Sequence, residues 1–212
     1  MLSVENLLAG YRSGVVAQLR SLELEQGQAA LIVGPSGSGK TTLLLAIAGL
    51  ARKFGGAVAI DNIDPYSLSG SARDRFRGRT LGFVFQDLHL VSGLSTLDNV
   101  LIAPFAAQQH QDQKRALALL DELGLGDVAH KRAERTSRGQ AQRVAIARAM
   151  LLRPKVLLAD EPTASLDDAA CETVAELLLR AASETGAALV IATHDARLKA
   201  RIPTIVTAEA AA

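Results

Sequence analysis

The chain has 212 residues, of which 49% are hydrophobic, and a formal net charge of +1 at pH 7. This length and composition suffice for one large globular domain, or for a domain with a small additional lobe. Because acidic and basic residues are nearly balanced, a broad positive surface is not predicted, and we expect no direct nucleic-acid binding. The single cysteine, Cys171, cannot form an internal disulfide and fits a reducing cytosol.

The apolar segments of the chain are short. None of them approaches the length that crosses a bilayer, and the N-terminus lacks the basic-then-apolar order of a signal peptide. We therefore expect any connection to a membrane to run through a partner.

Short apolar segments alternate with amphipathic helices along the chain, which predicts a mainly parallel sheet covered by helices. The predicted strands are residues 15–24, 29–33, 57–60, 81–85, 156–159 and 188–192. Two helical stripes are clear, one between Asp112 and Gly124 and one at residues 174–181.

The segment between the two halves of this pattern differs from the rest. It carries helix signals without a convincing central strand, so we predict a helical subdomain at about 87–139. The core of a single domain is then formed by about 1–86 and 140–212.

A glycine-rich segment between a buried strand and a helix carries the first chemical signal. It matches Gly-x4-Gly-Lys-Ser/Thr, a loop whose backbone N–H groups surround phosphates at a helix N-terminus. The predicted nucleotide-binding residues are Gly34, Pro35, Ser36, Gly37, Ser38, Gly39, Lys40, Thr41 and Thr42. We expect the Lys40 ammonium to contact the outer phosphates and the Thr41 hydroxyl to hold Mg²⁺.

Two adjacent acids end the apolar strand at residues 156–159. In an α/β sheet the ligand gathers at the carboxyl ends of the strands, and alternation separates the roles of neighbouring side chains. We expect Asp160 to bind the same Mg²⁺ as Thr41, and Glu161 to face the water that attacks the terminal phosphate.

Four further positions complete an ordered set: Tyr11, Gln86 at the end of a strand, Asp167 in Ser-Leu-Asp, and His194 in Thr-His-Asp. With these motifs nearly the whole chain resembles the nucleotide-binding subunit of an ABC transporter. The resemblance implies a RecA-like P-loop NTPase fold, with helices on both faces of the sheet, a small antiparallel β region and a helical subdomain. Its ligands are ATP and Mg²⁺.

The resemblance also implies a role for each of the four. Gln86 contacts the metal and the attacking water, and Asp167 belongs to the D-loop that crosses between subunits. His194 contacts the γ-phosphate, and Tyr11 stacks on adenine.

One motif departs from the family pattern. Before the helix at 140–149 the family carries Leu-Ser-Gly-Gly-Gln, which caps the γ-phosphate on a second, head-to-tail subunit, and this chain has Thr136 followed by Ser137, Arg138, Gly139 and Gln140. Ser137 and Gly139 still supply a hydroxyl and a close backbone N–H. The Arg138 guanidinium must swing clear, pair with the phosphate or hold the subunits apart, and the sequence leaves these three outcomes open.

Within the family, residues 79–100 most resemble the bacterial LolD, MacB and FtsE group. This resemblance implies a cytoplasmic ATPase, peripheral on the inner face of the bacterial cell membrane, with an integral membrane permease as partner. We expect residues 87–105 to form the coupling surface, and the second cassette to be a copy of this chain or a paralogous ATPase.

The leading hypothesis is ATP hydrolysis that drives the permease. The main alternative is a regulatory nucleotide-binding module whose hydrolysis is impaired by Arg138. A soluble ABC ATPase acting on DNA or ribosomes is disfavoured because no second cassette, coiled-coil insertion or basic extension occurs, and a small-molecule phosphotransferase is disfavoured by Gln86, Asp167 and His194.

Overall fold

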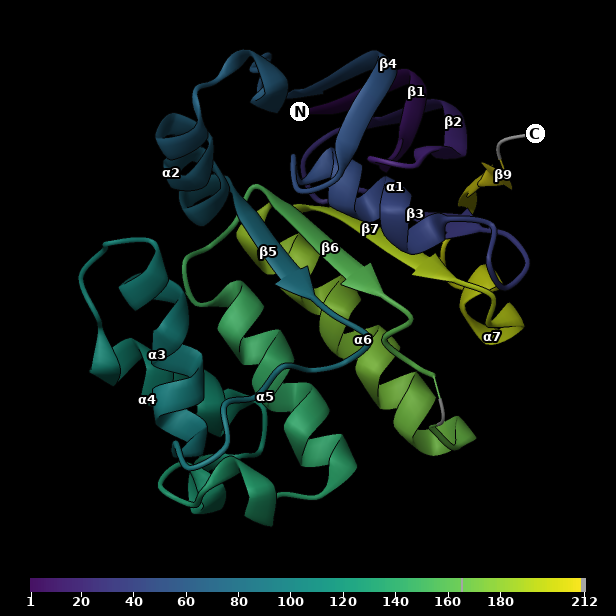
Figure 1. Cartoon of the computed structure of the whole chain (residues 1–212). Coiled ribbons are helices and arrows are strands. Elements are labelled where there is room, and N and C mark those ends of the chain that lie inside the picture. The colour runs from purple at the N-terminus through teal and green to yellow at the C-terminus, as the bar shows by residue number, and fades with distance from the viewer. Residues whose placement is uncertain (165, 211–212) are drawn as a thin grey trace.

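Helix α1 (Lys40–Ile47) lies between two β-sheets (Figure 1). The computed structural model describes residues 1–164 and 166–210. The parallel sheet runs from edge to edge through β5 (Leu81–Val84), β6 (Val156–Asp160), β7 (Ala188–Thr193), β3 (Ala29–Val33) and β8 (Thr204–Thr207). The antiparallel sheet runs through β4 (Arg52–Ile60), β1 (Leu2–Tyr11), β2 (Gly14–Leu24) and β9 (Glu209–Ala210).

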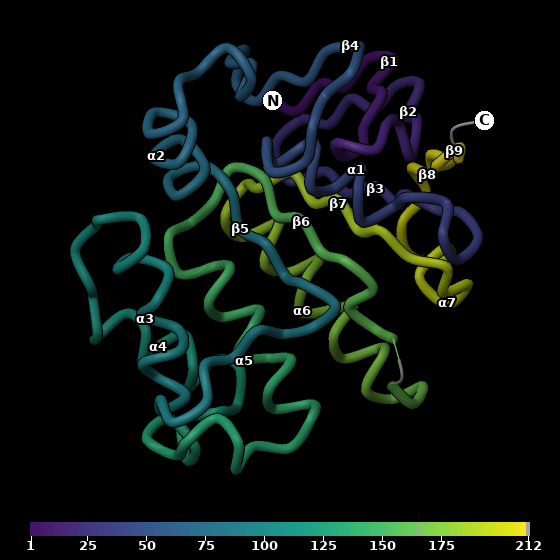
Figure 2. Tube along the Cα trace, viewed as in Figure 1, coloured from purple at the N-terminus to yellow at the C-terminus, as the bar shows by residue number. Residues whose placement is uncertain are grey.

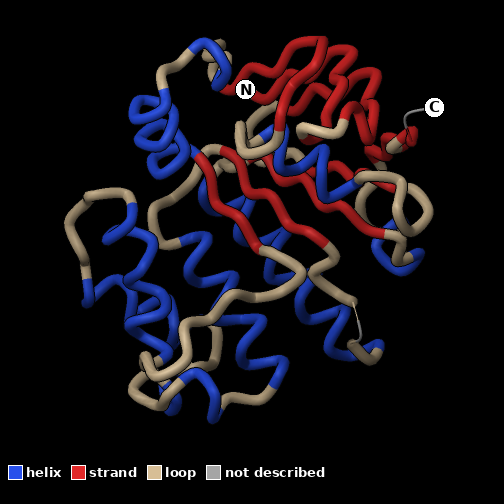
Figure 3. Tube along the Cα trace, in the orientation of Figure 1, coloured by secondary structure: helices blue, strands red, loops and turns tan. Residues whose placement is uncertain are grey.

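Both faces of the central strands β6 and β7 are buried, and their residues are apolar at nearly every position. Alternate residues divide between the two faces: Leu158 and Val190 pack toward α1 and the antiparallel sheet, whereas Leu157 and Leu189 pack toward the opposite side. Helices α5 (Arg138–Met150) and α6 (Asp168–Thr185) cover that opposite side, as Figure 3 shows.

A third apolar cluster joins α5 to the helices that precede it in the chain. These are α3 (Thr96–Ala106) and α4 (Gln113–Glu122), with the short 3₁₀ turns η2 (Gly126–Val128) and η3 (Ala133–Arg135). The remaining elements are η1 (Pro65–Ser67), α2 (Gly70–Thr80) and α7 (Ala196–Lys199). Within the described ranges, no helix combines the length and apolarity needed to span a bilayer.

The predicted caps of α4 are confirmed. The Asp112 carboxylate accepts from the backbone N–H of Arg115 at 2.9 Å, and Gly124 follows the helix with a φ of 65°. The stripe at residues 174–181 lies within α6.

The predicted fold class is confirmed, but two strands lie in a different sheet from the one expected. Residues 15–24 and 57–60 belong to the antiparallel sheet, where β2 and β4 both pair with β1. Three strands were also missed, β1, β8 and β9. The residues of a strand do not reveal which strand it pairs with. β2 pairs with β9 from the far end of the chain, so the last strand completes the sheet that contains the first strand, β1 (Figure 2).

Candidate nucleotide-binding site

The glycine loop joins the end of β3 directly to the first turn of α1. Gly37 and Gly39 have φ values of 80° and 82°, in the left-handed region that favours glycine. A Cβ on Gly39 would lie 2.4 Å from the Cβ of Ala17, so a side chain there has no room. Among the described residues no side chain caps the start of α1, which leaves its first N–H groups available to an anion.

The Lys40 ammonium is buried inside this loop. Its Nζ donates to the carbonyl oxygens of Gly34 at 3.0 Å and Pro35 at 3.2 Å, and lies 3.5 Å from Glu161 Oε1. The cation thus lies between its own loop and Glu161, the second acid at the end of β6.

Thr41 and Asp160 meet as the sequence predicts. The Thr41 hydroxyl donates to Asp160 Oδ2 at 2.7 Å, while Oδ1 is buried and has no hydrogen-bond partner in residues 1–164 and 166–210. Burial raises the pKa of the Asp160 carboxyl above its usual value, although the Thr41 hydrogen bond opposes this shift. A hydroxyl and a carboxylate with a free oxygen are ligands that suit Mg²⁺, so the residues present fit this ion.

Glu161 is held by several groups at once. Its backbone has a φ of 43° and its N–H donates to Ala192 O at 2.8 Å, one step past the end of β6. Its Oε1 lies 2.8 Å from His194 Nδ1, and its Oε2 accepts from the Thr193 hydroxyl at 3.0 Å. A left-handed conformation in a residue other than glycine costs about 1–3 kcal/mol and persists where the surroundings fix it.

These side chains line one cavity of about 390 Å³. Its lining residues are Val16, Ser36, Gly37, Gly39, Lys40, Thr41, Thr42, Gln86, Glu161 and His194. Gln86 reaches the cavity from the loop after β5, since this strand ends at Val84, one residue before the end of the predicted strand at 81–85. Tyr11 lies at the end of β1, half exposed, and its hydroxyl accepts from Thr42 Oγ1 at 3.4 Å.

The residues expected to act on a second subunit lie outside this cavity. Ser137 and Gln140 form a capping box at the start of α5, with Ser137 Oγ accepting from Gln140 N at 3.2 Å and Gln140 Oε1 accepting from Ser137 N at 2.9 Å. Arg138 donates from its guanidinium to Ala164 O at 3.5 Å in the same chain. A Cβ on Gly139 would meet nothing within 4 Å in the described chain.

Asp167 caps α6 by accepting from Ala170 N at 2.8 Å. Ser165, the first residue of the expected D-loop, lies outside the described residues.

The sequence analysis did not identify the polar contacts around Asp195, the residue after His194. Asp195 Oδ2 accepts from the Thr163 hydroxyl at 2.8 Å, and the Arg197 guanidinium holds the pKa of Asp195 well below its usual range. An acid directly after the histidine was the available signal, but nothing in the sequence indicated its partners.

This site defines a nucleotide-binding protein of the P-loop NTPase class. Its defining features are the glycine loop before α1, the buried Lys40, and the two acids at the end of β6. A family model described as ABC transporter matches residues 18–164, so the chain belongs to the ABC transporter family, as an ATP-binding ATPase subunit.

Two similar proteins support this family assignment. The lipoprotein-releasing system ATP-binding protein LolD 1 of Rhodopirellula baltica is 46% identical over 180 residues, which cover 84% of this chain and 79% of that protein. The LolD protein of Syntrophotalea carbinolica is 40% identical over 213 residues, covering 97% and 93%. The expected likeness to the LolD group is thereby confirmed.

A solved structure agrees with the fold. The dimeric post-hydrolysis state of the ATP-binding cassette MJ0796, bound to ADP and Pi, matches with a TM-score of 0.86 and 33% identity. The match covers 99% of this chain and 94% of that one.

Replacing Asp160 by Asn separates the effect of its buried charge on stability from its effect on Mg²⁺ binding. Because the charge of a buried carboxylate is costly, we expect Asp160→Asn without ligand to unfold at a temperature about 2–4 °C higher, the shift that about 1 kcal/mol produces in a chain of this size. Mg²⁺ added to ATP-saturated protein should raise the unfolding temperature of the wild type and leave that of Asp160→Asn unchanged. Differential scanning calorimetry checks both.

The exposed Asp127→Asn variant is the control and should respond to Mg²⁺ as the wild type does. A magnesium effect that survives in Asp160→Asn would contradict the metal assignment.

Proposed function

We propose that this chain and a second cassette bind Mg-ATP between them, head to tail, and hydrolyse it to drive an inner-membrane permease. The observation that carries the proposal is the position of the Glu161 carboxylate. It lies in one cavity with the glycine loop, 3.5 Å from Lys40 Nζ and 2.8 Å from His194 Nδ1.

The polar groups in and beside the cavity have separate chemical roles in this proposal. The N–H groups of the loop and the Lys40 ammonium bind the phosphates, for which Lys40 exchanges the carbonyls of Gly34 and Pro35 for phosphate oxygens. Glu161 accepts a proton from the attacking water, and His194 donates a hydrogen bond to the γ-phosphate. A magnesium ion held by Thr41 and Asp160, with Gln86 beside it, would offset the charge on the phosphoryl group.

The second cassette completes the site. Open space around Gly139 supports the approach of another molecule's phosphate to the start of α5, where the helix dipole favours an anion. Tyr11, beside Thr42, supplies a half-exposed ring for the adenine face. The second cassette is a copy of this chain or a paralogous ATPase.

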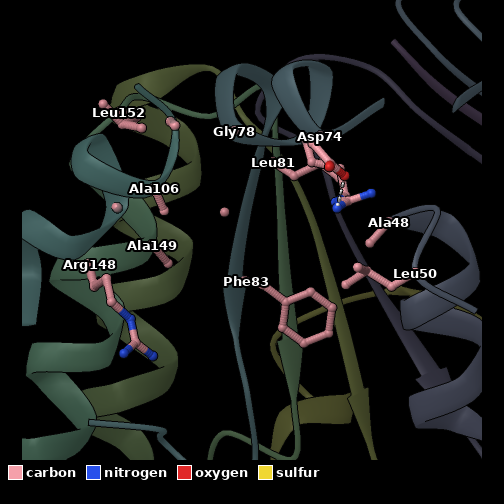
Figure 4. Close-up of a pocket in the computed structure, with 14 residues that line it drawn as sticks. Ala48, Leu50, Asp74, Gly78, Leu81, Phe83, Ala106, Arg148, Ala149 and Leu152 are labelled. Carbon is pink, nitrogen blue, oxygen red and sulfur yellow. Dashed lines mark hydrogen bonds and ion pairs between the residues drawn. The ribbon is translucent and has the colours of Figure 1, made fainter. Parts of the chain in front are cut away.

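A groove separate from this site suits the permease (Figure 4). Its volume is about 480 Å³, and it is bounded by α2, β5, α3 and α5. Its wall is mostly apolar, including Leu50 and Phe83, and the Arg77–Asp74 ion pair lies at one end. An apolar groove of this kind accepts the apolar face of a partner helix. Of residues 87–105, the surface expected from the sequence, Ala103 lines the groove.

The names of the LolD relatives favour a lipoprotein-releasing system over the drug-exporting and signalling types. The proposal puts the chain on the cytoplasmic face of a bacterial inner membrane, held there by the permease. We also propose that residues 87–139 form a helical subdomain on a core of residues 1–86 and 140–212, which the separate apolar cluster of α3, α4 and α5 supports.

Glu161→Gln tests the hydrolytic role. The amide still accepts from Thr193 but is a much weaker base, so we expect kcat to fall at least about 100-fold while the affinity for ATP stays within about threefold. Steady-state ATPase assays with the co-purified permease, and fluorescent-nucleotide binding, check this. Glu176→Gln, on the exposed side of α6, is the matched control. A Glu161→Gln protein with most of the wild-type rate would contradict the proposal.

Arg138→Gly tests the departure in the signature. Because the guanidinium is exposed and contacts Ala164 O of its own chain, we infer that it swings clear, and we expect ATPase rates within about threefold of wild type. Arg138→Ala controls for the added freedom of glycine. A rise of tenfold or more in both variants would identify Arg138 as a brake and favour the regulatory-module alternative.

Leu50→Glu tests the groove. Half of this side chain is exposed, so a charge there disturbs docking without unfolding the protein, and stimulation by the permease should be lost at unchanged basal ATPase activity. Ile205→Glu, on β8 at the opposite edge of the sheet and 42% exposed, is the matched control. Equal stimulation of both variants would place the permease elsewhere.

A further inference from the structure

The Arg197 guanidinium joins two loops that are far apart in the sequence. On one side its Nε and an Nη atom donate to both carboxylate oxygens of Asp195 at 2.7–3.1 Å. On the other side it donates to Asp168 Oδ1 at 2.7 Å and to Leu166 O at 3.4 Å. One side chain on α7 thus connects the histidine loop to the loop that precedes α6.

Asp195 continues this connection to the reacting groups. Its backbone N–H donates to Thr193 Oγ1 at 3.0 Å, and the same hydroxyl donates to Glu161 Oε2 at 3.0 Å. Its carboxylate also accepts from Thr163, two residues after Glu161. An unbroken series of contacts therefore runs from Asp168 to the Glu161 carboxylate.

The high exposure of Asp168 argues against a purely stabilising role for its ion pair with Arg197. The Asp168 side chain is 95% exposed, whereas that of Asp195 is 14% exposed. An ion pair to so exposed a carboxylate adds little to folding stability. The contribution of Arg197 is to orient its partners. Its planar guanidinium binds both carboxylates in fixed directions, which a lysine ammonium does not do.

We propose that Arg197 is a positioning residue that ties residues 166–168 to the Glu161 and His194 side chains. The inference rests on the proposed function, in which a second cassette completes the site, and on the D-loop role between subunits that the family resemblance implies for Asp167. When that cassette arrives and shifts residues 166–168, Arg197 transmits the shift through Asp195 and sets the Glu161 carboxylate for catalysis. Pairing of the two cassettes then also positions the Glu161 carboxylate.

The chain contains a matched control for this contact. Arg201 binds Glu172 Oε1 at 3.1 Å, so it joins the segment after α7 to α6, and in the described part of the chain it makes no hydrogen bond or ion pair with residues 166–168. A role in stability alone predicts that Arg197→Gln and Arg201→Gln behave alike. A positioning role predicts that only Arg197→Gln affects catalysis.

The experiment measures kcat, KM and unfolding temperature for both variants, for Asp168→Asn and for Arg197→Gln/Asp168→Asn, each with the permease. We expect Arg197→Gln to lower kcat about tenfold at nearly unchanged KM, since small displacements of a catalytic group are costly. Asp168→Asn should lower kcat about threefold at unchanged unfolding temperature, and the double variant should be no slower than Arg197→Gln because both changes cut one connection. Arg201→Gln should leave kcat unchanged.

The inference is overturned by an Arg197→Gln kcat within twofold of wild type, by an equal loss in Arg201→Gln, or by losses that multiply in the double variant. If Arg197→Gln unfolds, Asp168→Asn decides: an unchanged kcat overturns the inference. A wild-type protein that is inactive with its permease overturns the proposed function and this inference together, whereas an active wild type with a normal Arg197→Gln variant overturns this inference alone.

Discussion

The parallel pairing of β3, β7 and β6 is the constraint on which the site depends. Val33 pairs with Thr193 and Asp160 pairs with Ala192, so the three strands end at the same edge of the sheet. The residues that follow are therefore neighbours although they are far apart in the sequence. A register shift of one residue would turn alternate side chains to the opposite face and separate Glu161 from its contacts with Thr193 and His194.

The carboxyl ends of these strands bring together charged side chains that are shielded from water. Asp160 carries a buried oxygen without a hydrogen-bond partner in the described chain, Lys40 is folded back onto loop carbonyls, and Glu161 holds a left-handed backbone. Each feature costs free energy in the ligand-free protein. A metal ion on the free Asp160 oxygen and phosphate oxygens beside the Lys40 ammonium would offset the first two costs. The Glu161 backbone is instead held by its protein contacts with Ala192, Thr193 and His194.

The sequence predicted most of the site because its residues adjoin strand ends that local apolar patterns reveal. The glycine loop and the pair Asp160 and Glu161 were recognisable from local spacing alone. The sheet assignment of β2 and β4 was wrong, and β1 was missed, because strand pairing is set by distant segments. Arg197 was missed for the same reason, since its partners come from another loop.

Ser137 and Gln140 form a capping box, which the local sequence pattern Ser-x-x-Gln indicates. The sequence analysis interpreted these residues only as part of the family signature and did not predict the capping box. The Ser137 hydroxyl accepts from Gln140 N and can still donate its own O–H, so the start of α5 offers a phosphate this O–H together with backbone N–H groups and the helix dipole. The departure at Arg138 leaves those groups in place.

A structure of the Glu161→Gln protein with its permease, saturated with Mg-ATP and determined by cryo-electron microscopy, tests the central claim most directly. The account predicts two joined cassettes, with each ATP bound to the glycine loop of one and to residues 137–139 of the other. Cassettes that stay apart with nucleotide bound to each alone would contradict it.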